Sequence, residues 1–314
     1  MGKVAFVFPG QGAQAVGMGQ DAYAASEQAK RLFDRADELL GYKLTDLIFN
    51  GPDDQLKLTY HTQPALLTVS VALLALLQDA GITPDYVAGH SLGEYSALVA
   101  AGVMSFDDAV KTVRLRGEFM DKAVPAGIGA MAAVLGAERE ALQKLCETIS
   151  TEVAAVELAN VNCPGQIVVS GTKAGVDAVA ERGKEAGAKR VIPLEVSGPF
   201  HSSLMKPAAD KLAEVLGTVQ MKDAQVQVIA NVTAAPVQEA GAIRALLAEQ
   251  VYSPVLWEDS VKRMIADGVD TFIEIGSGSV LAGLIKKIDR EVRVVSLSSL
   301  EAIEAYKKEA SAHA

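Results

Sequence analysis

A serine that could act as a nucleophile lies at position 91, inside the run Gly-His-Ser-Leu-Gly at residues 89–93. The residues before this run, 86–88, are apolar and strand-like, and residues 92–101 are helix-like up to Gly102. A serine at a sharp strand-to-helix turn is a nucleophile elbow, and glycines flank it because the turn leaves no room for Cβ atoms. Free N–H groups at the start of the helix could stabilise an oxyanion. We therefore predict a catalytic serine, with a glycine-rich structural turn as the alternative.

A serine nucleophile needs a general base, and His201 is the best-placed histidine. It lies in the loop at residues 197–202, Ser-Gly-Pro-Phe-His-Ser. From the spacing alone, a general base and a surface-loop histidine are equal alternatives. His90 is predicted to be a packing residue, because strand alternation and the elbow aim it away from the Ser91 hydroxyl.

No acidic residue is placed to complete a catalytic triad. In the hydrolase order the acid lies between the serine and the histidine. In that span the aspartates all fall on helices whose pattern indicates solvent exposure: Asp107, Asp108, Asp121 and Asp177. A backbone or amide carbonyl could orient the imidazole instead.

Two further features could contribute to binding. Residues 10–15 follow a strand and resemble the glycine-rich fingerprint of dinucleotide-binding sites. No second strand ending in an acidic residue follows, which disfavours a nucleotide site. We therefore expect this loop to supply a backbone N–H to an oxyanion hole. Arg116 lies in a largely apolar helical turn and could bind a substrate carboxylate bidentately. A surface salt bridge is the alternative for Arg116, and it is the usual fate of arginine.

The composition narrows the class of protein. The 314 residues carry 29 Lys and Arg against 39 Asp and Glu, a net charge of −10, which argues against a general nucleic-acid binder. Two cysteines and four scattered histidines give no disulfide framework and no metal-ligand spacing, so we expect no metal. The apolar stretch at residues 65–77 is shorter than the roughly 20 residues of a membrane span, and the N-terminus shows no secretory signal. We expect a cytoplasmic protein that binds no membrane.

Strands and helices alternate along most of the chain, which predicts an α/β fold with a parallel sheet covered by helices. Residues 4–8 are expected to form a strand and residues 20–40 one helix. Pro64 fits the first turn of a helix that runs to about residue 80.

The middle of the chain follows a different order. Between residues 130 and 196 the expected elements run β-α-β-β-α-β, a ferredoxin-like arrangement, with residues 160–165 as a turn-rich connection between two strands. We therefore predict an inserted small domain at residues 125–198 within a catalytic domain formed by residues 1–124 and 199–314.

Taken together, six sequence blocks resemble the malonyl-CoA:acyl carrier protein transacylase family, which serves bacterial fatty acid synthesis. The resemblance spans nearly the whole chain in order and spacing. The blocks are residues 10–14 (GQGAQ), 89–94 (GHSLGE), 114–117 (RLRG), 160–166 (Asn-x-Asn-x-Pro-x-Gln), 198–202 (Gly-x-Phe-His-Ser) and 274–276 (EIG). It implies the same fold, an α/β-hydrolase-like core with a ferredoxin-like insertion.

The resemblance also implies site roles. Ser91 would be the nucleophile, His201 the base, and the main-chain carbonyl of Gln250 would orient His201, which accounts for the missing acid. Gln11 and Leu92 would give the oxyanion N–H groups. Arg116 would pair with the malonyl carboxylate, Phe200 resembles the malonyl-selective form, and Asn160 and Asn162 would bind substrate.

The implied reaction uses malonyl-CoA as donor and the phosphopantetheine thiol of acyl carrier protein as acceptor, with no cofactor. A serine esterase or thioesterase is the alternative, and a non-catalytic carrier-docking module is a second one. We expect a monomer. An acidic carrier protein would need a local basic patch, for which residues 189–190 (Lys-Arg) and 286–287 (Lys-Lys) are candidates, although solvated surface charge is the simpler explanation of each.

Overall fold

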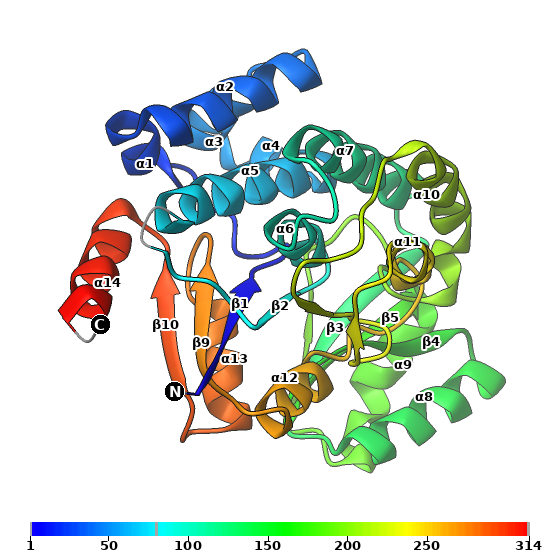
Figure 1. Ribbon diagram of the computed structural model, residues 1–314. Coiled ribbons are helices and arrows are strands. Elements are labelled where there is room, and N and C mark those ends of the chain that lie inside the picture. Colours follow the sequence, from blue (N-terminus) through cyan, green and yellow to red (C-terminus); the bar gives the residue numbers. More distant parts are fainter. Residues whose placement is uncertain (1, 79–80, 313–314) are drawn as a thin grey trace.

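The computed structural model describes residues 2–78 and 81–312, and it contains two sheets (Figure 1). The larger sheet has the order β10-β9-β1-β2-β7-β8, and all of its pairings are parallel except β7 with β8. Its strands are β1 (Lys3–Phe8), β2 (Tyr86–Gly89), β7 (Gln227–Ile229), β8 (Pro236–Val237), β9 (Val269–Ile275) and β10 (Arg293–Leu297).

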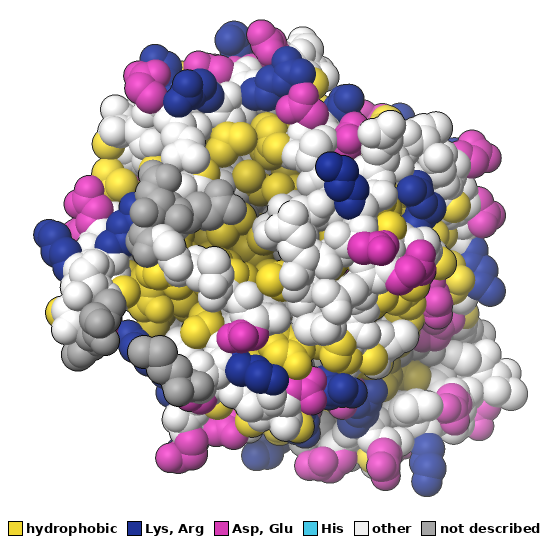
Figure 2. Space-filling view, in the orientation of Figure 1, with side chains coloured by type: hydrophobic (Ala, Val, Ile, Leu, Met, Phe, Trp, Pro, Cys, Tyr) yellow, Lys and Arg dark blue, Asp and Glu magenta, His cyan; other side chains and the backbone are white. Residues whose placement is uncertain are grey.

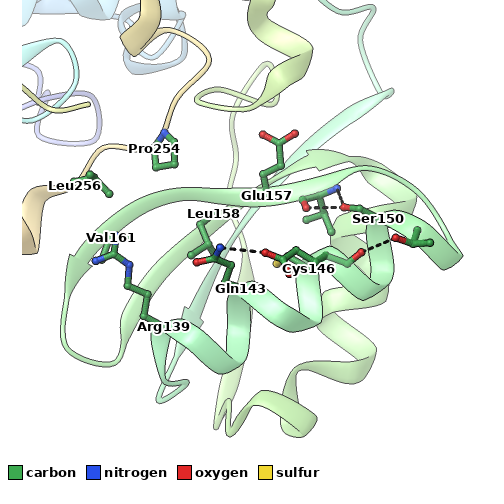
Figure 3. A pocket seen from close by; sticks show the side chains of 12 residues that line it. Arg139, Gln143, Cys146, Ser150, Glu157, Leu158, Val161, Pro254 and Leu256 are labelled. Atoms are coloured by element: carbon green, nitrogen blue, oxygen red, sulfur yellow. Dashed lines mark hydrogen bonds between the residues drawn. The ribbon is translucent and has the colours of Figure 1, made fainter. Parts of the chain in front are cut away.

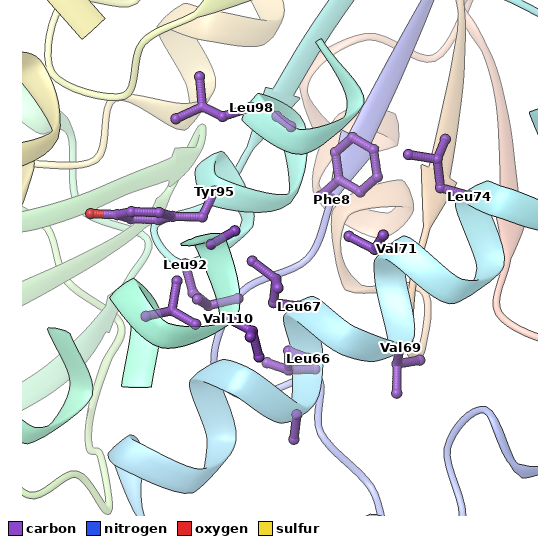
Figure 4. Packing of buried hydrophobic residues seen from close by; sticks show 14 of the residues in the cluster. Phe8, Leu66, Leu67, Val69, Val71, Leu74, Leu92, Tyr95, Leu98 and Val110 are labelled. Atoms are coloured by element: carbon purple, nitrogen blue, oxygen red, sulfur yellow. The ribbon is translucent and has the colours of Figure 1, made fainter. Parts of the chain in front are cut away.

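Helices cover both faces of this sheet, because side chains on each strand alternate between two apolar cores. Phe6 and Phe8 of β1 join a core with helices α5 (Thr59–Gln78), α6 (Gly93–Ala100) and α7 (Phe106–Lys122), which Figure 4 shows from close by. Ala5 and Val7 point the other way, into a core with α12 (Trp257–Ala266) and α13 (Val280–Ile288).

The remaining helices of this part surround the layers. Near the N-terminus they are α1 (Gln20–Ala25), α2 (Glu27–Leu40), α3 (Leu44–Asn50) and α4 (Asp53–Leu56), and later α10 (Lys206–Thr218), α11 (Ala240–Gln250) and α14 (Leu300–Ala312). The single helix expected over residues 20–40 is wrong. Ser26 adopts an extended conformation, ends α1 and caps α2 by accepting a hydrogen bond from the Ala29 N–H.

The smaller sheet has the order β4-β5-β3-β6, with every pairing antiparallel. Its elements follow the predicted order: β3 (Gly129–Leu135), α8 (Arg139–Glu152), β4 (Val156–Cys163), β5 (Gln166–Thr172), α9 (Lys173–Arg182) and β6 (Arg190–Pro193). The predicted α/β-hydrolase-like core with a ferredoxin-like insertion is thereby confirmed as a fold class. The limits drawn at residues 124/125 and 198/199 stay a prediction.

The small sheet faces the larger domain with one side only. Its other side packs on α8 and α9 in a separate apolar core, whereas Met131, Ala159 and Val168 join the core of the larger domain. Strand β4 is also hydrogen-bonded to the larger domain, since the Val255 N–H donates to the Ala159 carbonyl at 2.8 Å. The expected turn over residues 160–165 is wrong. Pairing with β5 and hydrogen bonds to Val255 extend β4 to Cys163, which leaves only Pro164 and Gly165 for the turn.

Helix α5 begins earlier than expected, so Pro64 lies inside it. Proline cannot donate to the carbonyl four residues before it, that of Tyr60, and Arg114 donates to this carbonyl instead at 3.0 Å. With the added residues, α5 is the one described helix long and apolar enough to cross a membrane. Of its apolar window, Thr59–Leu77, 89% is buried inside the protein, as expected of a core helix.

Candidate active site

Ser91 occupies the predicted elbow between β2 and α6, with a φ of 51°. Glycines are required on both sides of it by close packing. A Cβ on Gly89 would overlap the backbone of Gly93, and a Cβ on Gly93 would overlap the carbonyl oxygen of Phe8 in β1. Strand β2, helix α6 and strand β1 therefore approach one another at backbone distance, and the serine stands at the carboxyl edge of the parallel sheet, where such folds place their sites.

His201 meets Ser91 in this site, which removes the alternative of a surface-loop histidine. Its Nε2 lies 2.8 Å from the Ser91 Oγ, and the side chain is buried. Its Nδ1 lies 2.8 Å from the carbonyl oxygen of Gln250 at the end of α11. Because a carbonyl only accepts, Nδ1 carries the proton and Nε2 is free to accept the Ser91 proton.

Burial and, second to it, the nearby positive charge of Arg116 together lower the pKa of His201 to about 3. The imidazole is therefore neutral near pH 7, as a general base must be. No described acidic side chain hydrogen-bonds to His201, so the carbonyl of Gln250 takes the place that an aspartate holds in a triad.

Arg116 is buried, with 1% of its surface exposed, so the surface salt bridge considered for it is wrong. Its Nη1 donates to the Gln63 side chain at 2.8 Å, and its Nη2 donates to the Gln250 side chain at 2.9 Å and to the Ser91 Oγ at 3.1 Å. Among the described residues no carboxylate lies within 4 Å of its guanidinium. The Glu94 carboxyl acts on this charge through space, but every direct hydrogen-bond partner is neutral, so the guanidinium beside the nucleophile is suited to receive an anionic ligand.

Two backbone N–H groups near Ser91 are free to bind an oxyanion. Within residues 2–78 and 81–312, neither the Gln11 N–H nor the Leu92 N–H donates to another protein atom. Both residues line the pocket that contains Ser91 and His201. The Gln11 loop can lie this close to the elbow because residue 10 is a glycine, whose Cβ, if present, would overlap the His90 carbonyl oxygen.

The pocket around these groups measures about 120 Å³, far below the roughly 300–1,000 Å³ of sites that enclose drug-sized ligands. Phe200 and Asn160 line it, together with Met120 and Met131. Asn162 is not among the lining residues, and its Oδ1 lies 2.8 Å from the Nε2 of His90, which is. The pocket admits a small acyl group and leaves the rest of a larger donor outside.

The His90 ring packs on Trp257 and is held by Asn162 rather than by the Ser91 hydroxyl, as predicted, and His90 also lines the pocket. Its ring centroid lies 5.8 Å from that of Trp257, and its hydrogen bond to Asn162 joins the elbow to β4 of the small sheet.

Three site residues were missed by sequence reasoning: Gln63, Glu94 and Asn231. Glu94 and Asn231 are 2% and 1% exposed and hydrogen-bond around the elbow. A polar residue two positions after the strand of residues 226–229 is a signal that could have indicated Asn231, because parallel strands end at the same edge. Gln63 lies in α5 and gave no local signal.

Other polar features lie apart from this chemistry. A cavity of about 540 Å³ lies between α8, β4 and the segment around Pro254 (Figure 3). Neither Ser91, His201 nor Arg116 lines it. Burial raises the pKa of Cys146, which borders this cavity, to about 12. Within the described residues no three His, Cys, Asp or Glu side chains gather to hold a metal ion.

Comparisons with known proteins agree with this geometry. The model of the acyl transferase domain family matches residues 5–313. A Bacillus subtilis protein named malonyl CoA-acyl carrier protein transacylase is 59% identical over 304 residues, covering 97% of this chain and 96% of the relative. A Staphylococcus aureus protein of the same name is 48% identical over 306 residues, covering 98% and 99%.

Solved structures agree as well. An acyl carrier protein S-malonyltransferase from Vibrio cholerae superposes with a TM-score of 0.94 at 46% identity, covering 97% of this chain and 99% of its own. A malonyl-transacylase in complex with its type II PKS acyl-carrier protein gives 0.95 at 42% identity, covering 98% and 99%.

Proposed function

Because this chain belongs to the acyl transferase domain family, we propose that it transfers a malonyl group from malonyl-CoA to the phosphopantetheine thiol of acyl carrier protein, through a malonyl-Ser91 intermediate. The observation that carries the choice of acyl group is Arg116. Its buried guanidinium lies 3.1 Å from the Ser91 Oγ and has no carboxylate partner among the described residues, so a dicarboxylic acyl group supplies the missing anion.

In the first half-reaction His201 Nε2 accepts the Ser91 proton while Oγ attacks the malonyl thioester carbonyl. The Gln11 and Leu92 N–H groups stabilise the tetrahedral oxyanion. The Gln250 carbonyl keeps the imidazole oriented and stabilises the imidazolium, which then protonates the leaving CoA thiolate.

In the second half-reaction the carrier's thiol attacks the malonyl-serine, and His201 accepts the thiol proton before returning a proton to Ser91. Nucleophile, base and oxyanion donors all come from the chain itself, so the proposed reaction needs no metal and no redox cofactor. Asn160, which lines the pocket from β4, contacts the donor or acceptor, Asn162 supports this side of the site through its hydrogen bond to His90, and Phe200 limits the size of the acyl group.

The same elbow could serve an esterase or thioesterase, and three features favour transfer. The base lacks an acidic partner, the acyl pocket contains a buried cation, and the pocket is too small for a large hydrophobic acyl chain. Malonate release without an acceptor thiol at the rate of transfer would favour hydrolysis instead.

The acceptor is expected to be acidic, so a basic surface should meet it. On the face in Figure 2, basic and acidic side chains are interspersed, which leaves only local patches. The side chains of Lys189 and Arg190 are exposed and make no hydrogen bond within the described residues, whereas Lys286 and Lys287 are hydrogen-bonded to Val292 and Gln166. We therefore favour Lys189 and Arg190 as the docking patch. We also propose that the protein acts as a cytoplasmic monomer.

One assay tests this function. Purified protein is incubated with radiolabelled malonyl-CoA and holo-acyl carrier protein, and labelled carrier is counted for the parent chain and for Ser91→Ala. We expect transfer by the parent and loss of both transfer and protein labelling in the variant. Equal transfer by both proteins would refute the serine intermediate.

A further inference from the structure

Asn231 bridges the two sides of the nucleophile elbow. It follows β7 at the carboxyl edge of the large sheet and is 1% exposed. Its Oδ1 accepts a hydrogen bond from the Ser91 N–H at 2.8 Å, and its Nδ2 donates to the Gly89 carbonyl oxygen at 2.7 Å. The peptide plane before Ser91 is thereby tied to the end of β2.

The peptide plane after Ser91 is held by a different side chain. Gln250 Nε2 donates to the Ser91 carbonyl oxygen at 3.0 Å. This carbonyl and the Leu92 N–H belong to one planar trans peptide, so they point in opposite directions. Holding the carbonyl therefore aims the Leu92 N–H into the pocket.

Glu94 holds both of these side chains. Its Oε2 accepts from Gln250 Nε2 at 2.7 Å and from the Asn231 N–H at 3.2 Å, and the carboxyl group is 2% exposed. One buried oxygen thus links the supports of the two peptide planes.

The support is needed because Ser91 has a left-handed backbone, with φ at 51°. A non-glycine residue keeps such a conformation only where its surroundings over-determine it. A relaxed Ser91 would turn both its Oγ and the Leu92 N–H away from the reacting carbonyl. The Ser91 N–H, already bound to Asn231, is also removed as a competing donor.

We propose that Asn231 and Glu94 are positioning residues that fix the two peptide planes around Ser91, so that the nucleophile and the Leu92 N–H are aimed together. This inference rests on the proposed function, because it assigns the support of the same oxyanion site. In this role the Glu94 side chain acts as a hydrogen-bond acceptor for Gln250 Nε2 and the Asn231 N–H. The proposal predicts a defect in acylation and none in donor binding, since Arg116 binds the donor.

The test compares Asn231→Ala with the parent chain. Single-turnover labelling of Ser91 by malonyl-CoA should slow by about 10- to 100-fold, less than the 100- to 1,000-fold typical of deleting an oxyanion donor. Malonyl-CoA affinity, measured with both proteins in the Ser91→Ala background, should stay unchanged. An unchanged labelling rate, or an equal loss in affinity, overturns the role of Asn231.

A matched control separates positioning from stability. Thr45→Ala also removes buried hydrogen bonds, to Asp37 and to the Phe33 carbonyl, but in the helical layer of α2 and α3. It should lower the Tm while labelling proceeds at the parent rate. If Thr45→Ala slows labelling as much as Asn231→Ala does, the effect is one of stability and the proposal fails.

A second pair keeps the proposal testable if Asn231→Ala does not fold. Glu94→Gln retains an acceptor oxygen and should label Ser91 nearly as fast as the parent, whereas Glu94→Ala should be slow. Equal slowing in both would mean that Glu94 acts through its charge, which overturns its role as an acceptor. Failure of the parent itself to label Ser91 would refute the proposed function, a result distinct from all of these.

Discussion

The Ser91 Oγ and the His201 Nε2 lie 2.8 Å apart, and both residues have a positive φ, at 51° and 58°. Neither is a glycine, so each backbone is in a conformation that L-residues rarely adopt. Strain of this kind gathers at functional sites, where the surroundings hold it in place. In this protein the two strained loops come from different parts of the chain and present their side chains to one another.

Replacing His201 with alanine removes the acceptor of the Ser91 proton. We expect single-turnover labelling of Ser91 by malonyl-CoA to slow by about 100- to 10,000-fold, the usual contribution of a general base. His61→Ala is the matched control, since His61 hydrogen-bonds to the Gln55 carbonyl and does not line the pocket. Labelling of His201→Ala at the parent rate would place the base elsewhere.

Replacing Arg116 with alanine should change which acyl group is transferred. A hydrogen bond to a charged group contributes about 1.5–3 kcal/mol, so malonyl transfer should fall roughly 10- to 150-fold. Acetyl transfer from acetyl-CoA should be retained or increased, because an acetyl group brings no carboxylate and the variant has no buried guanidinium that would be left without one.

Arg114→Ala is the control for this change. Arg114 lies on the same helix but pairs with Glu118 and donates to Tyr42, away from the pocket. Its ratio of malonyl to acetyl transfer should match that of the parent. Equal losses of both acyl groups in Arg116→Ala would contradict the assigned carboxylate contact.

The pH dependence of acylation should report the charge of Arg116. Burial and then Arg116 lower the pKa of His201, so the base stays neutral and kcat/KM for malonyl-CoA should be flat from about pH 8 down to well below the ordinary histidine value near 6.5. Arg116→Ala removes one of the lowering causes, so protonation of His201 should begin at higher pH. A pH profile of the variant with acetyl-CoA, compared with the parent, measures this. A shift of the acid limb to lower pH would contradict the assigned coupling.

The docking patch predicts a defect that depends on the acceptor. Reversing the charge at Lys189 and Arg190 should raise KM for holo-acyl carrier protein severalfold and leave KM for malonyl-CoA unchanged, because rim charges act mainly on association. The same reversal at Lys286 and Lys287 is the comparison, since those side chains are already hydrogen-bonded within the protein. An unchanged carrier KM in the first variant would reject the patch.

Local sequence predicted the elements well where one short segment determines its own conformation. The elbow follows from glycines that alone allow β2, α6 and β1 to meet at backbone distance. The β-α-β-β-α-β order was also predictable, because each element shows its own periodicity. The same local view failed at residues 160–163, where pairing with β5 and Val255 extends a strand through a sequence typical of turns.

The sequence by itself determined the conformation of the elbow, the order of the elements and, through six blocks of residues, the family resemblance. Only the tertiary structure decided what surrounds Ser91: a base whose orienting partner is a main-chain carbonyl, a buried Arg116 without a carboxylate, and the support from Asn231. The physical reason is distance along the chain. Backbone conformation depends on neighbouring residues, whereas these contacts join positions 25 to 159 residues away from Ser91 and exist only once the two sheets and their helices have packed.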